Sequence, residues 1–250
     1  LRRDADRLGF PKSFTIYDTS DQERAMKEVY KQLLVDDKFL PVRSALGQIG
    51  RMKDQLISPE EALEAPASNT KASLLAKVYA AYAKRLKSAG AMDFDDLIYH
   101  TVRLLQEHAD VREYYQQKYQ YILVDEYQDT SVAQFHLVRL LTGPKQNVCV
   151  VGDDDQSIYR FRGATIENIL NFEQHFPGAK VIRLEQNYRS TSNILNAANC
   201  VIKNNQGRKG KTLWTDNGGG DVVTVKTTFN ESDEANYVAG DILMGVNRGR

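Results

Sequence analysis

The spacing of apolar residues predicts helices over the first part of the chain. One helix follows a capping-box pattern at Ser20 and Glu23, and its apolar face contains Met26, Val29, Tyr30, Leu33 and Leu34. The run Ser-Pro-Glu-Glu at 58–61 indicates a second helix start, with proline at its favoured first position. A longer helix ends near Gly90, and its apolar face contains Leu74, Leu75, Val78, Tyr79, Tyr82 and Leu86. We expect its tyrosines to lie in the core.

Beyond Gly90, helical patterns alternate with short apolar runs. Runs at 122–124, 147–152 and 180–184 predict strands, and their alternation with helices predicts a parallel sheet covered on both faces. Further along, a helix is expected over 194–202 and a strand over 222–227. The expected fold class is therefore α/β, with a mainly helical part at 1–90, an α/β part at 91–183 and a third part at 184–250.

Each predicted strand ends in polar residues. The buried strand expected at 122–124 runs into Asp125 and Glu126, the second into Asp-Asp-Asp-Gln at 153–156, and the third into Glu-Gln-Asn-Tyr-Arg at 185–189. Open parallel sheets bind ligands at the carboxyl ends of their strands. One of two adjacent carboxylates can hold Mg²⁺ while the other deprotonates an attacking water. A lone Asp-Glu pair would indicate only a solvated strand end, but here two other polar strand ends accompany it.

Composition favours a cytoplasmic protein: the 250 residues are 42% hydrophobic and 26% charged. No apolar run approaches the roughly 20 residues of a membrane span, and no signal-like segment follows Leu1. Cys149 and Cys200 lack Cys-x-x-Cys spacing, which favours reduced thiols. No metal-ligand pattern joins the histidines, His100, His108, His136 and His175. The 33 basic and 33 acidic residues cancel, so any contact with nucleic acid must come from local clustering.

Three strings carry a resemblance to a known family: VDEYQDT at 124–130, VGDDDQSIYRFRGA at 151–164 and LEQNYRST at 184–191. In this order they resemble motifs II, III and IV of superfamily 1 DNA helicases of the UvrD/PcrA/Rep family. The resemblance covers essentially the whole chain, including the Phe-Asp-Asp-Leu segment at 94–97. It implies partial RecA-like motor domains of the P-loop NTPase type: a helical insertion at 1–90, the later half of the first motor domain at 91–183, and the start of the second at 184–250.

The same resemblance implies an ATP-dependent DNA helicase of the bacterial cytoplasm, associated with the nucleoid when it works. Such an enzyme uses ATP and Mg²⁺, translocates along single-stranded DNA with an expected three-prime to five-prime polarity, and unwinds duplex junctions. Repair or replication proteins are its expected partners. The pathway and the oligomeric state stay open.

Three residues of the first two motifs receive nucleotide roles by resemblance. Asp125 would coordinate Mg²⁺, and Glu126 would be the general base that activates water. Gln156 would contact the γ-phosphate and report its occupancy to the DNA-binding side, since an amide both donates and accepts. A simple turn amide is the alternative for Gln156.

The third motif supplies an adenine contact and an arginine. By resemblance, Tyr188 would stack on adenine, and Arg189 would reach across the cleft between motor domains to the γ-phosphate. ATP drawn into this cleft would then close it. A helix is expected to begin at Ser190, so its positive end would leave an unpaired Arg189 unfavourable unless an anion faced it. A surface pair with Glu185 is the alternative.

The segment Tyr159-Arg160-Phe161-Arg162 alternates aromatic and basic residues. Rings can stack on bases without reading sequence, and guanidinium groups can follow phosphates, so the pattern suits single-stranded DNA. By resemblance, Tyr159 and Phe161 form stacking pockets between which bases move, although the family usually carries tryptophan where Phe161 stands. On composition alone, two aromatic rings packed beneath a strand end are equally expected.

No phosphate-binding loop of the pattern G-x-x-x-x-G-K-[ST] occurs in this sequence. The triplet Gly210-Lys211-Thr212 fails because Asn205 stands five positions before Gly210. We therefore interpret the chain as an internal piece of a larger enzyme, lacking N- and C-terminal segments and inactive as an ATPase alone. Two other classes stay open. One is a non-catalytic DNA-binding or interaction module, and the other is a metal-dependent nuclease that uses Asp125, Asp153, Asp154 and Asp155.

Overall fold

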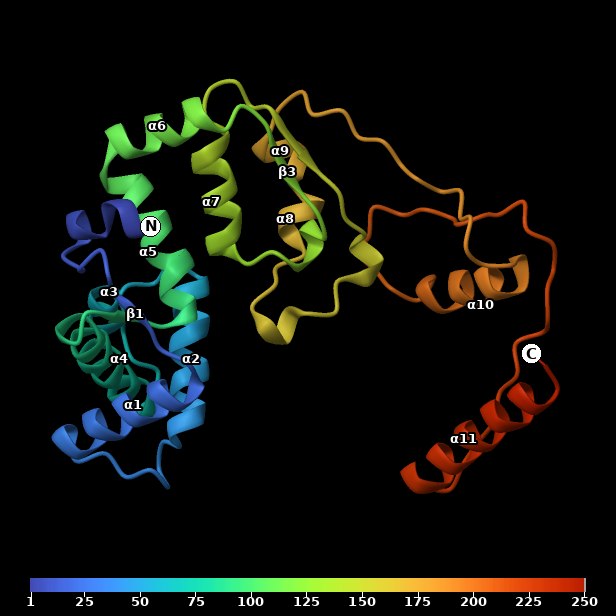
Figure 1. Cartoon of the computed structure of the whole chain (residues 1–250), viewed down its shortest axis with the longest axis horizontal. Helices are drawn as coiled ribbons and strands as arrows, with labels where there is room; N and C mark the ends of the chain where they lie inside the picture. Colours follow the sequence, from blue (N-terminus) through green and yellow to red (C-terminus); the bar gives the residue numbers. More distant parts are fainter. Residues whose placement is uncertain (250) are drawn as a thin grey trace. The chain divides into compact units, whose positions relative to one another are not determined.

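The structure, a computed structural model that describes residues 1–249, consists of two compact units, Leu1–Lys180 and Val181–Arg250 (Figure 1). The first unit contains, in chain order, η1 Arg2–Leu8, β1 Thr15–Ile16, α1 Thr19–Leu33, α2 Val42–Asp54, α3 Pro59–Glu64, α4 Thr70–Ser88, β2 Ala91–Met92, α5 Phe94–Glu107, α6 Ala109–Lys118, β3 Ile122–Val124, η2 Tyr127–Asp129, α7 Val132–Thr142, β4 Val148–Val150, η3 Asp154–Gln156, η4 Arg160–Arg162, α8 Glu167–Leu170 and α9 Phe172–His175. The second contains α10 Ser192–Ile202 and α11 Glu231–Asn247. The expected α/β fold class is confirmed, and the divisions at residues 90 and 183 stay predictions.

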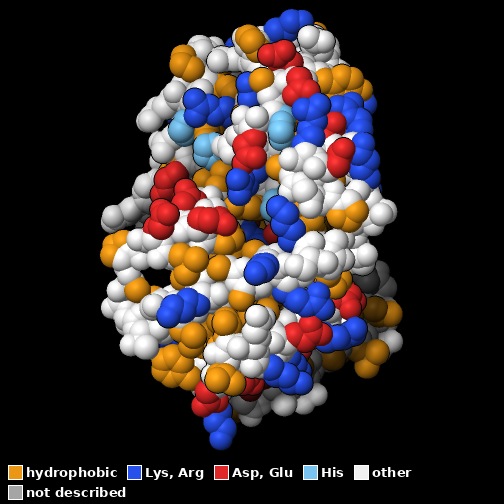
Figure 2. Space-filling view, turned by 90° about the vertical axis from the view of Figure 1, so that its left-hand side faces the viewer, with side chains coloured by type: hydrophobic (Ala, Val, Ile, Leu, Met, Phe, Trp, Pro, Cys, Tyr) orange, Lys and Arg blue, Asp and Glu red, His pale blue; other side chains and the backbone are white. Residues whose placement is uncertain are grey.

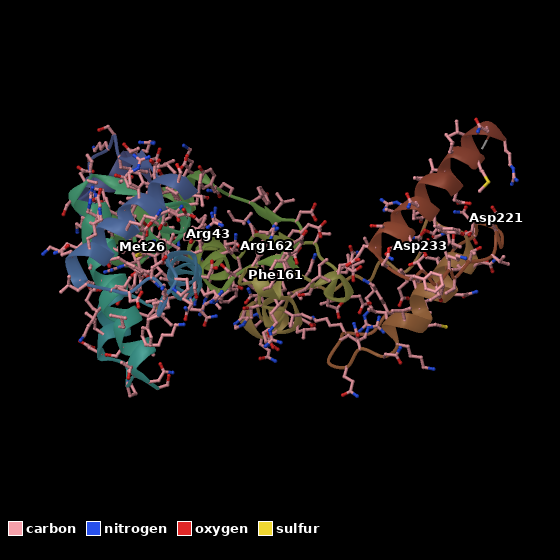
Figure 3. All side chains as sticks on the ribbon, turned by 90° about the horizontal axis from the view of Figure 1, so that it is seen from below. Met26, Arg43, Phe161, Arg162, Asp221 and Asp233 are labelled. Carbon is pink, nitrogen blue, oxygen red and sulfur yellow. The ribbon has the colours of Figure 1, made fainter. Side chains whose placement is uncertain are left out.

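Helices α1, α2 and α4 form the largest hydrophobic core of the first unit (Figure 1). Met26 of α1 is fully buried in it (Figure 3), and so are Tyr79 and Tyr82 of α4, as the sequence predicted. The predicted start of α3 is also confirmed, since the Ser58 hydroxyl accepts a hydrogen bond from the Glu61 backbone N–H at 3.0 Å.

The capping box expected at Ser20 and Glu23 is wrong. The N-cap of helix α1 lies two residues earlier, at Asp18. The Asp18 carboxylate accepts hydrogen bonds from the backbone N–H groups of Ser20 and Asp21 at 2.8 and 2.9 Å. An ionised carboxylate satisfies these groups and also interacts favourably with the positive end of the helix, which explains why Asp18 takes the position.

A short parallel sheet joins the start of the chain to the segment after α4. Strands β1 and β2 pair with Thr15 opposite Ala91, so helices α1 to α4 form the connection between two neighbouring strands. Helix α5 follows directly, and its capping residues Asp93 and Asp96 both contact Lys53 of α2, with Nζ–Oδ distances of 2.7 Å. This buried cluster ties the helical part to α5.

A second parallel sheet, β3 and β4, carries the polar strand ends. Helix α7 forms the crossover between the two strands, as parallel pairing requires. Tyr127, Phe135 of α7 and Phe176 form a core against which Val124 and the valines of β4 pack. The opposite face is uncovered, with Leu123 78% exposed, so the expectation of a buried strand in a sheet covered on both faces is wrong for this chain.

The second unit has less regular pairing than the sequence predicted. The predicted helix over 194–202 is confirmed as α10. The strands expected at 180–184 and 222–227 are wrong: the described residues of this unit pair as an isolated bridge between Gln186 and Trp214 instead. Both segments expose their apolar side chains, for example Leu184 at 77% and Val222 at 80%. Without a neighbouring strand to receive its N–H and C=O groups, an apolar run gains little by becoming a strand.

Acidic and basic side chains are interspersed on the face drawn in Figure 2, in keeping with the net charge of zero. Within residues 1–249, no helix combines the length and apolar character that a membrane crossing requires.

Candidate functional site

Asp125 and Glu126 lie directly after β3, at its carboxyl end. The backbone N–H of Glu126 donates to Asp125 Oδ1 at 2.9 Å. Glu126 has left-handed backbone angles, φ 48° and ψ 42°, a conformation that costs a side-chain-bearing residue about 1–2 kcal/mol. The next residue is fixed, because the Tyr127 N–H donates to the Val151 carbonyl at 2.9 Å and its ring is fully buried. This turn leaves both carboxylates exposed beside the edge of the sheet.

Gln128 connects this turn to the loop after β4. Its side chain is buried, with the residue only 1% exposed. The Nε2 group donates to Glu126 Oε2 at 2.8 Å, and Oε1 accepts from the Asp153 backbone N–H at 2.9 Å. A longer contact, 3.4 Å, runs from the Ser157 hydroxyl to the Gln128 carbonyl. The two strand ends are thus joined through one amide side chain.

Gly152 makes room for that amide. A Cβ atom at this position would lie 2.7 Å from Gln128 Oε1 and 2.8 Å from Ile169 Cδ1. Both separations are shorter than the contacts that a Cβ atom makes with other heavy atoms, so any larger residue at position 152 would displace the Gln128 side chain or α8. The glycine of the second string is therefore needed for close approach between the two strand ends.

Gln156 stands at the end of the same series of contacts. Asp153 caps the short helix η3, and its Oδ1 accepts from the Asp155 backbone N–H at 3.0 Å. The Gln156 amide Nε2 donates to Asp153 Oδ2 at 2.7 Å. Hydrogen bonds therefore lead from Glu126 through Gln128 and Asp153 to Gln156.

The aromatic and basic segment forms an exposed loop. Phe161 is 71% exposed and Tyr159 38%, and their ring centroids lie 6.0 Å apart with the planes tilted by 42°. The guanidinium carbon of Arg162 lies 5.1 Å from the Tyr159 ring centroid and 5.5 Å from that of Phe161 (Figure 3). Phe161 is therefore not packed beneath a strand end. Its ring and the Arg160 and Arg162 side chains are open to a ligand.

Tyr188 and Arg189 lie in a turn of the second unit. Asn187 Oδ1 accepts from the backbone N–H groups of Arg189 and Ser190 at 3.0 and 2.7 Å, which fixes the turn. Both side chains are exposed, Tyr188 at 79%, and the Tyr188 hydroxyl donates to Gln186 Oε1 at 2.8 Å.

The helix expected at Ser190 begins later, at Ser192 with Thr191 as N-cap. The helix start predicted at Ser190 is therefore wrong by two residues, and Arg189 lies two positions before the N-cap. The alternative pairing also fails: within the described residues, no ion pair joins Arg189 to Glu185.

Two other features of the sequence have clear positions. The segment 210–212 lies in an irregular stretch after α10 and does not join a strand to a helix. Within residues 1–249, no group of three or more His, Cys, Asp or Glu side chains gathers as a metal-binding cluster.

Sequence reasoning missed Gln128 and the capping role of Asp153. A signal for the first was present, since Gln128 is an amide two positions after Glu126 in the string VDEYQDT. No sequence pattern identifies its partner, the backbone N–H of Asp153. Only the pairing of β3 with β4 brings the two together.

Comparison with known proteins agrees with the three strings. Residues 1–177 match the model of the UvrD/REP helicase N-terminal domain, and residues 182–249 match that of the UvrD-like helicase C-terminal domain. The chain is 50% identical over all 250 residues to a protein named ATP-dependent DNA helicase PcrA from Staphylococcus epidermidis. It is 48% identical over the same length to the protein of that name from Staphylococcus aureus. The chain spans 34% of the length of these curated relatives. Because the two domain models together match nearly the whole chain, the chain belongs to the UvrD/REP helicase family.

Proposed function

We propose that this chain is part of a longer ATP-dependent DNA helicase that translocates along single-stranded DNA and unwinds duplex junctions. The observation that carries the proposal is the hydrogen-bonded connection from Glu126 to Gln156, which ends three positions before Tyr159. A carboxylate suited to activating water and an exposed aromatic loop are thus linked over a short path. By itself, without a phosphate-binding loop, the chain is expected to be inactive as an ATPase.

In this proposal Glu126 is the general base and Asp125 holds Mg²⁺. Asp125 fits a magnesium ligand because Oδ1 is engaged by the Glu126 N–H while the exposed side chain leaves Oδ2 open to solvent. Magnesium keeps several waters and needs only one or two protein carboxylates beside the phosphates. When bound, the ion would neutralise charge on the phosphates. Gln156 would exchange its contact with Asp153 for one with the γ-phosphate.

The loop at 159–162 is the proposed DNA contact. Tyr159 and Phe161 would stack on bases, and Arg160 and Arg162 would follow phosphates. The near position of Arg162 over both rings supports this assignment, since it already places a cation beside two stacking surfaces. Stacking does not require base-specific hydrogen bonds, as translocation along any sequence demands.

The turn of the second unit is the proposed adenine and γ-phosphate contact. Tyr188 would stack on the base, and Arg189 would stabilise charge that develops on the transferring phosphoryl group. Their exposure and the Asn187 hydrogen bonds that fix the turn support these roles. We also propose a bacterial cytoplasmic location, repair or replication proteins as partners, and the remaining segments of the same polypeptide as the source of the phosphate-binding loop.

The test is DNA-stimulated ATP turnover by the full-length protein carrying Glu126→Gln or Arg189→Ala. Removing a general base is expected to lower kcat by about 10²–10⁴-fold, and removing an arginine finger by about 10³–10⁵-fold. Far-UV circular dichroism should be unchanged, because both side chains are exposed.

Matched controls are Glu113→Gln on α6 and Arg183→Ala in the second unit, both at exposed positions. These variants should keep wild-type turnover. Wild-type turnover by Glu126→Gln would overturn the assignment of the base. A full-length protein that binds single-stranded DNA but never hydrolyses ATP would instead establish a non-catalytic binding module.

A further inference from the structure

The contacts of Gln128 define the direction in which its amide points. The Asp153 backbone N–H can only donate, so the atom that faces it at 2.9 Å must be the amide oxygen. The NH₂ group is then turned toward the Glu126 carboxylate, which can only accept when ionised. A flipped amide would place two acceptors together at one end and two donors together at the other. The orientation of Gln128 is therefore determined from both ends.

Burial makes this orientation hard to change. Gln128 is 1% exposed, and an amide removed from water without partners costs about 1–3 kcal/mol. The Gly152 backbone and Ile169 leave no space beside its oxygen, as the separations from a Cβ at residue 152 show. Glu126, by contrast, is exposed and stands in a left-handed turn. Gln128 is the rigid partner of the two.

We propose that Gln128 is a positioning residue that holds the Glu126 carboxylate in its reactive direction and ties it to the loop of Gln156. This inference rests on the proposed function, because it assumes that Glu126 activates water. An exposed glutamate samples several rotamers, whereas one charge-assisted hydrogen bond from a buried donor restricts Oε2 and leaves Oε1 for the water. Catalytic geometry must hold within fractions of an ångström, and a misplacement of about 1 Å costs about 10²-fold in rate.

The second contact gives Gln128 a further role. When Gln156 leaves Asp153 for a phosphate, the cap of η3 loses one of its hydrogen bonds. A shift of the Asp153 backbone would then be passed directly to the Gln128 amide and so to Glu126. The path contains one side chain between the two strand ends. Occupancy of the phosphate site would thereby be coupled to the position of the Glu126 carboxylate without movement of the sheet.

The deciding variant is Gln128→Glu in the full-length protein. It keeps the size of the side chain and an acceptor for the Asp153 N–H, but it replaces the donor that faces Glu126 with a carboxylate oxygen. We expect kcat for ATP to fall about 10–100-fold while KM for ATP stays within about threefold, because positioning of water and not nucleotide binding is lost.

A purely structural role of Gln128 would not lower kcat at an unchanged KM in a folded variant. Gln134→Glu is the matched control: it is exposed on α7, and its Oε1 accepts from the Ser131 N–H at 2.9 Å, a contact that glutamate preserves. This control should keep the wild-type kcat and KM. If Gln128→Glu proves unfolded by circular dichroism, Gln128→Asn decides. It remains polar but is one methylene too short to contact both partners, so kcat should again fall at unchanged KM.

The outcomes separate this inference from the proposed function. Wild-type kcat in a folded Gln128 variant, together with an inactive Glu126→Gln variant, would overturn the role of Gln128 and leave the helicase assignment standing. Wild-type turnover by Glu126→Gln would overturn both. A fall in kcat/KM caused only by a raised KM would also overturn the inference, because it would place Gln128 in nucleotide binding.

Discussion

Lys53 is the residue whose removal should destabilise the first unit most clearly. Its ammonium group lies 2.7 Å from Asp93 Oδ2 and 2.7 Å from Asp96 Oδ1, and the three side chains are between 2% and 7% exposed. Burial alone would lower the pKa of Lys53, but the two carboxylates raise it above its ordinary value. The Tyr82 hydroxyl adds a hydrogen bond to Asp93 at 3.2 Å. The cluster is therefore satisfied only while the lysine is present.

The change Lys53→Met keeps the length and the apolar stem of the side chain and removes the charge. It leaves two carboxylates buried against each other, and breaking a buried pair by removing one partner costs about 3–5 kcal/mol. For a unit of this size, Tm falls about 2–4 °C per kcal/mol, which gives a drop of roughly 6–20 °C. Because domains are stable by about 5–15 kcal/mol, this loss is a large fraction of the total.

Urea unfolding followed by far-UV circular dichroism measures the effect, since most helices belong to the first unit. Fluorescence of Trp214, the single tryptophan, reports the second unit and should be unchanged. Lys27→Met, an exposed substitution on α1, is the matched control and should stay within about 0.5 kcal/mol of wild type.

The pH dependence provides the second half of this test. Without the lysine, the pKa of Asp93 loses the cation that holds it below its usual value, and the pKa of Asp96, which burial already raises, rises further. The folded variant therefore binds more protons than the wild type in mildly acidic solution. Its deficit relative to wild type should therefore shrink as the pH falls from 8 toward 5. A deficit below about 1 kcal/mol, or one that does not change with pH, would refute the reasoning.

Three further predictions concern single side chains. Tyr127→Phe should stabilise the protein by about 1 kcal/mol in urea unfolding, because the buried hydroxyl has no hydrogen-bond partner among the described residues; a loss of stability would mean that it has one. Burial, with a contribution from Asp95, raises the pKa of Asp54 to about 6. Asp54→Asn should therefore stabilise by about 1–2 kcal/mol at pH 8, and this gain should disappear between pH 6 and 4, where wild type takes up its proton; a gain independent of pH would contradict the shift. Phe161→Ala should weaken binding of single-stranded DNA to the full-length protein by about 5–150-fold in fluorescence anisotropy, whereas the exposed control Phe39→Ala should not.

Sequence patterns correctly predicted the elements that depend on contacts between residues close together in the chain. The Ser58 capping box and the apolar face of α4 follow from residues within a few positions of each other, and both were predicted. The strand that ends before Asp125 was also predicted, because an apolar run followed by acids marks a strand end. The same rule failed at 180–184, where the pattern is similar but the described structure supplies no neighbouring strand. A strand depends on its partner more than a helix does.

The sequence patterns did not predict contacts between residues that lie far apart in the chain. The pairing of Thr15 with Ala91 and the cluster of Lys53 with Asp93 join segments that are separated by whole helices. The strings that resemble known motifs placed Asp125 and Glu126 at a strand end but gave no reason for Gln128 to be buried beside them. Its environment exists only because β3 and β4 are neighbours. The roles of these residues in catalysis stay predictions.

The loop that carries Phe161, residues 153–165, is attached at both of its ends to the segment that carries Glu126. At its start, the Asp153 N–H donates to Gln128 Oε1 at 2.9 Å, and at its end the Thr165 N–H donates to the Thr130 carbonyl at 3.0 Å. Between these anchors, Phe161 is 71% exposed and free to meet a ligand. A base stacked on Phe161 is therefore expected to act on residues 128 and 130, which these two hydrogen bonds connect to the loop. Gln128 and Thr130 stand two and four positions after Glu126, and the Gln128 amide donates to the Glu126 carboxylate, so movement of the loop should be felt first at this turn.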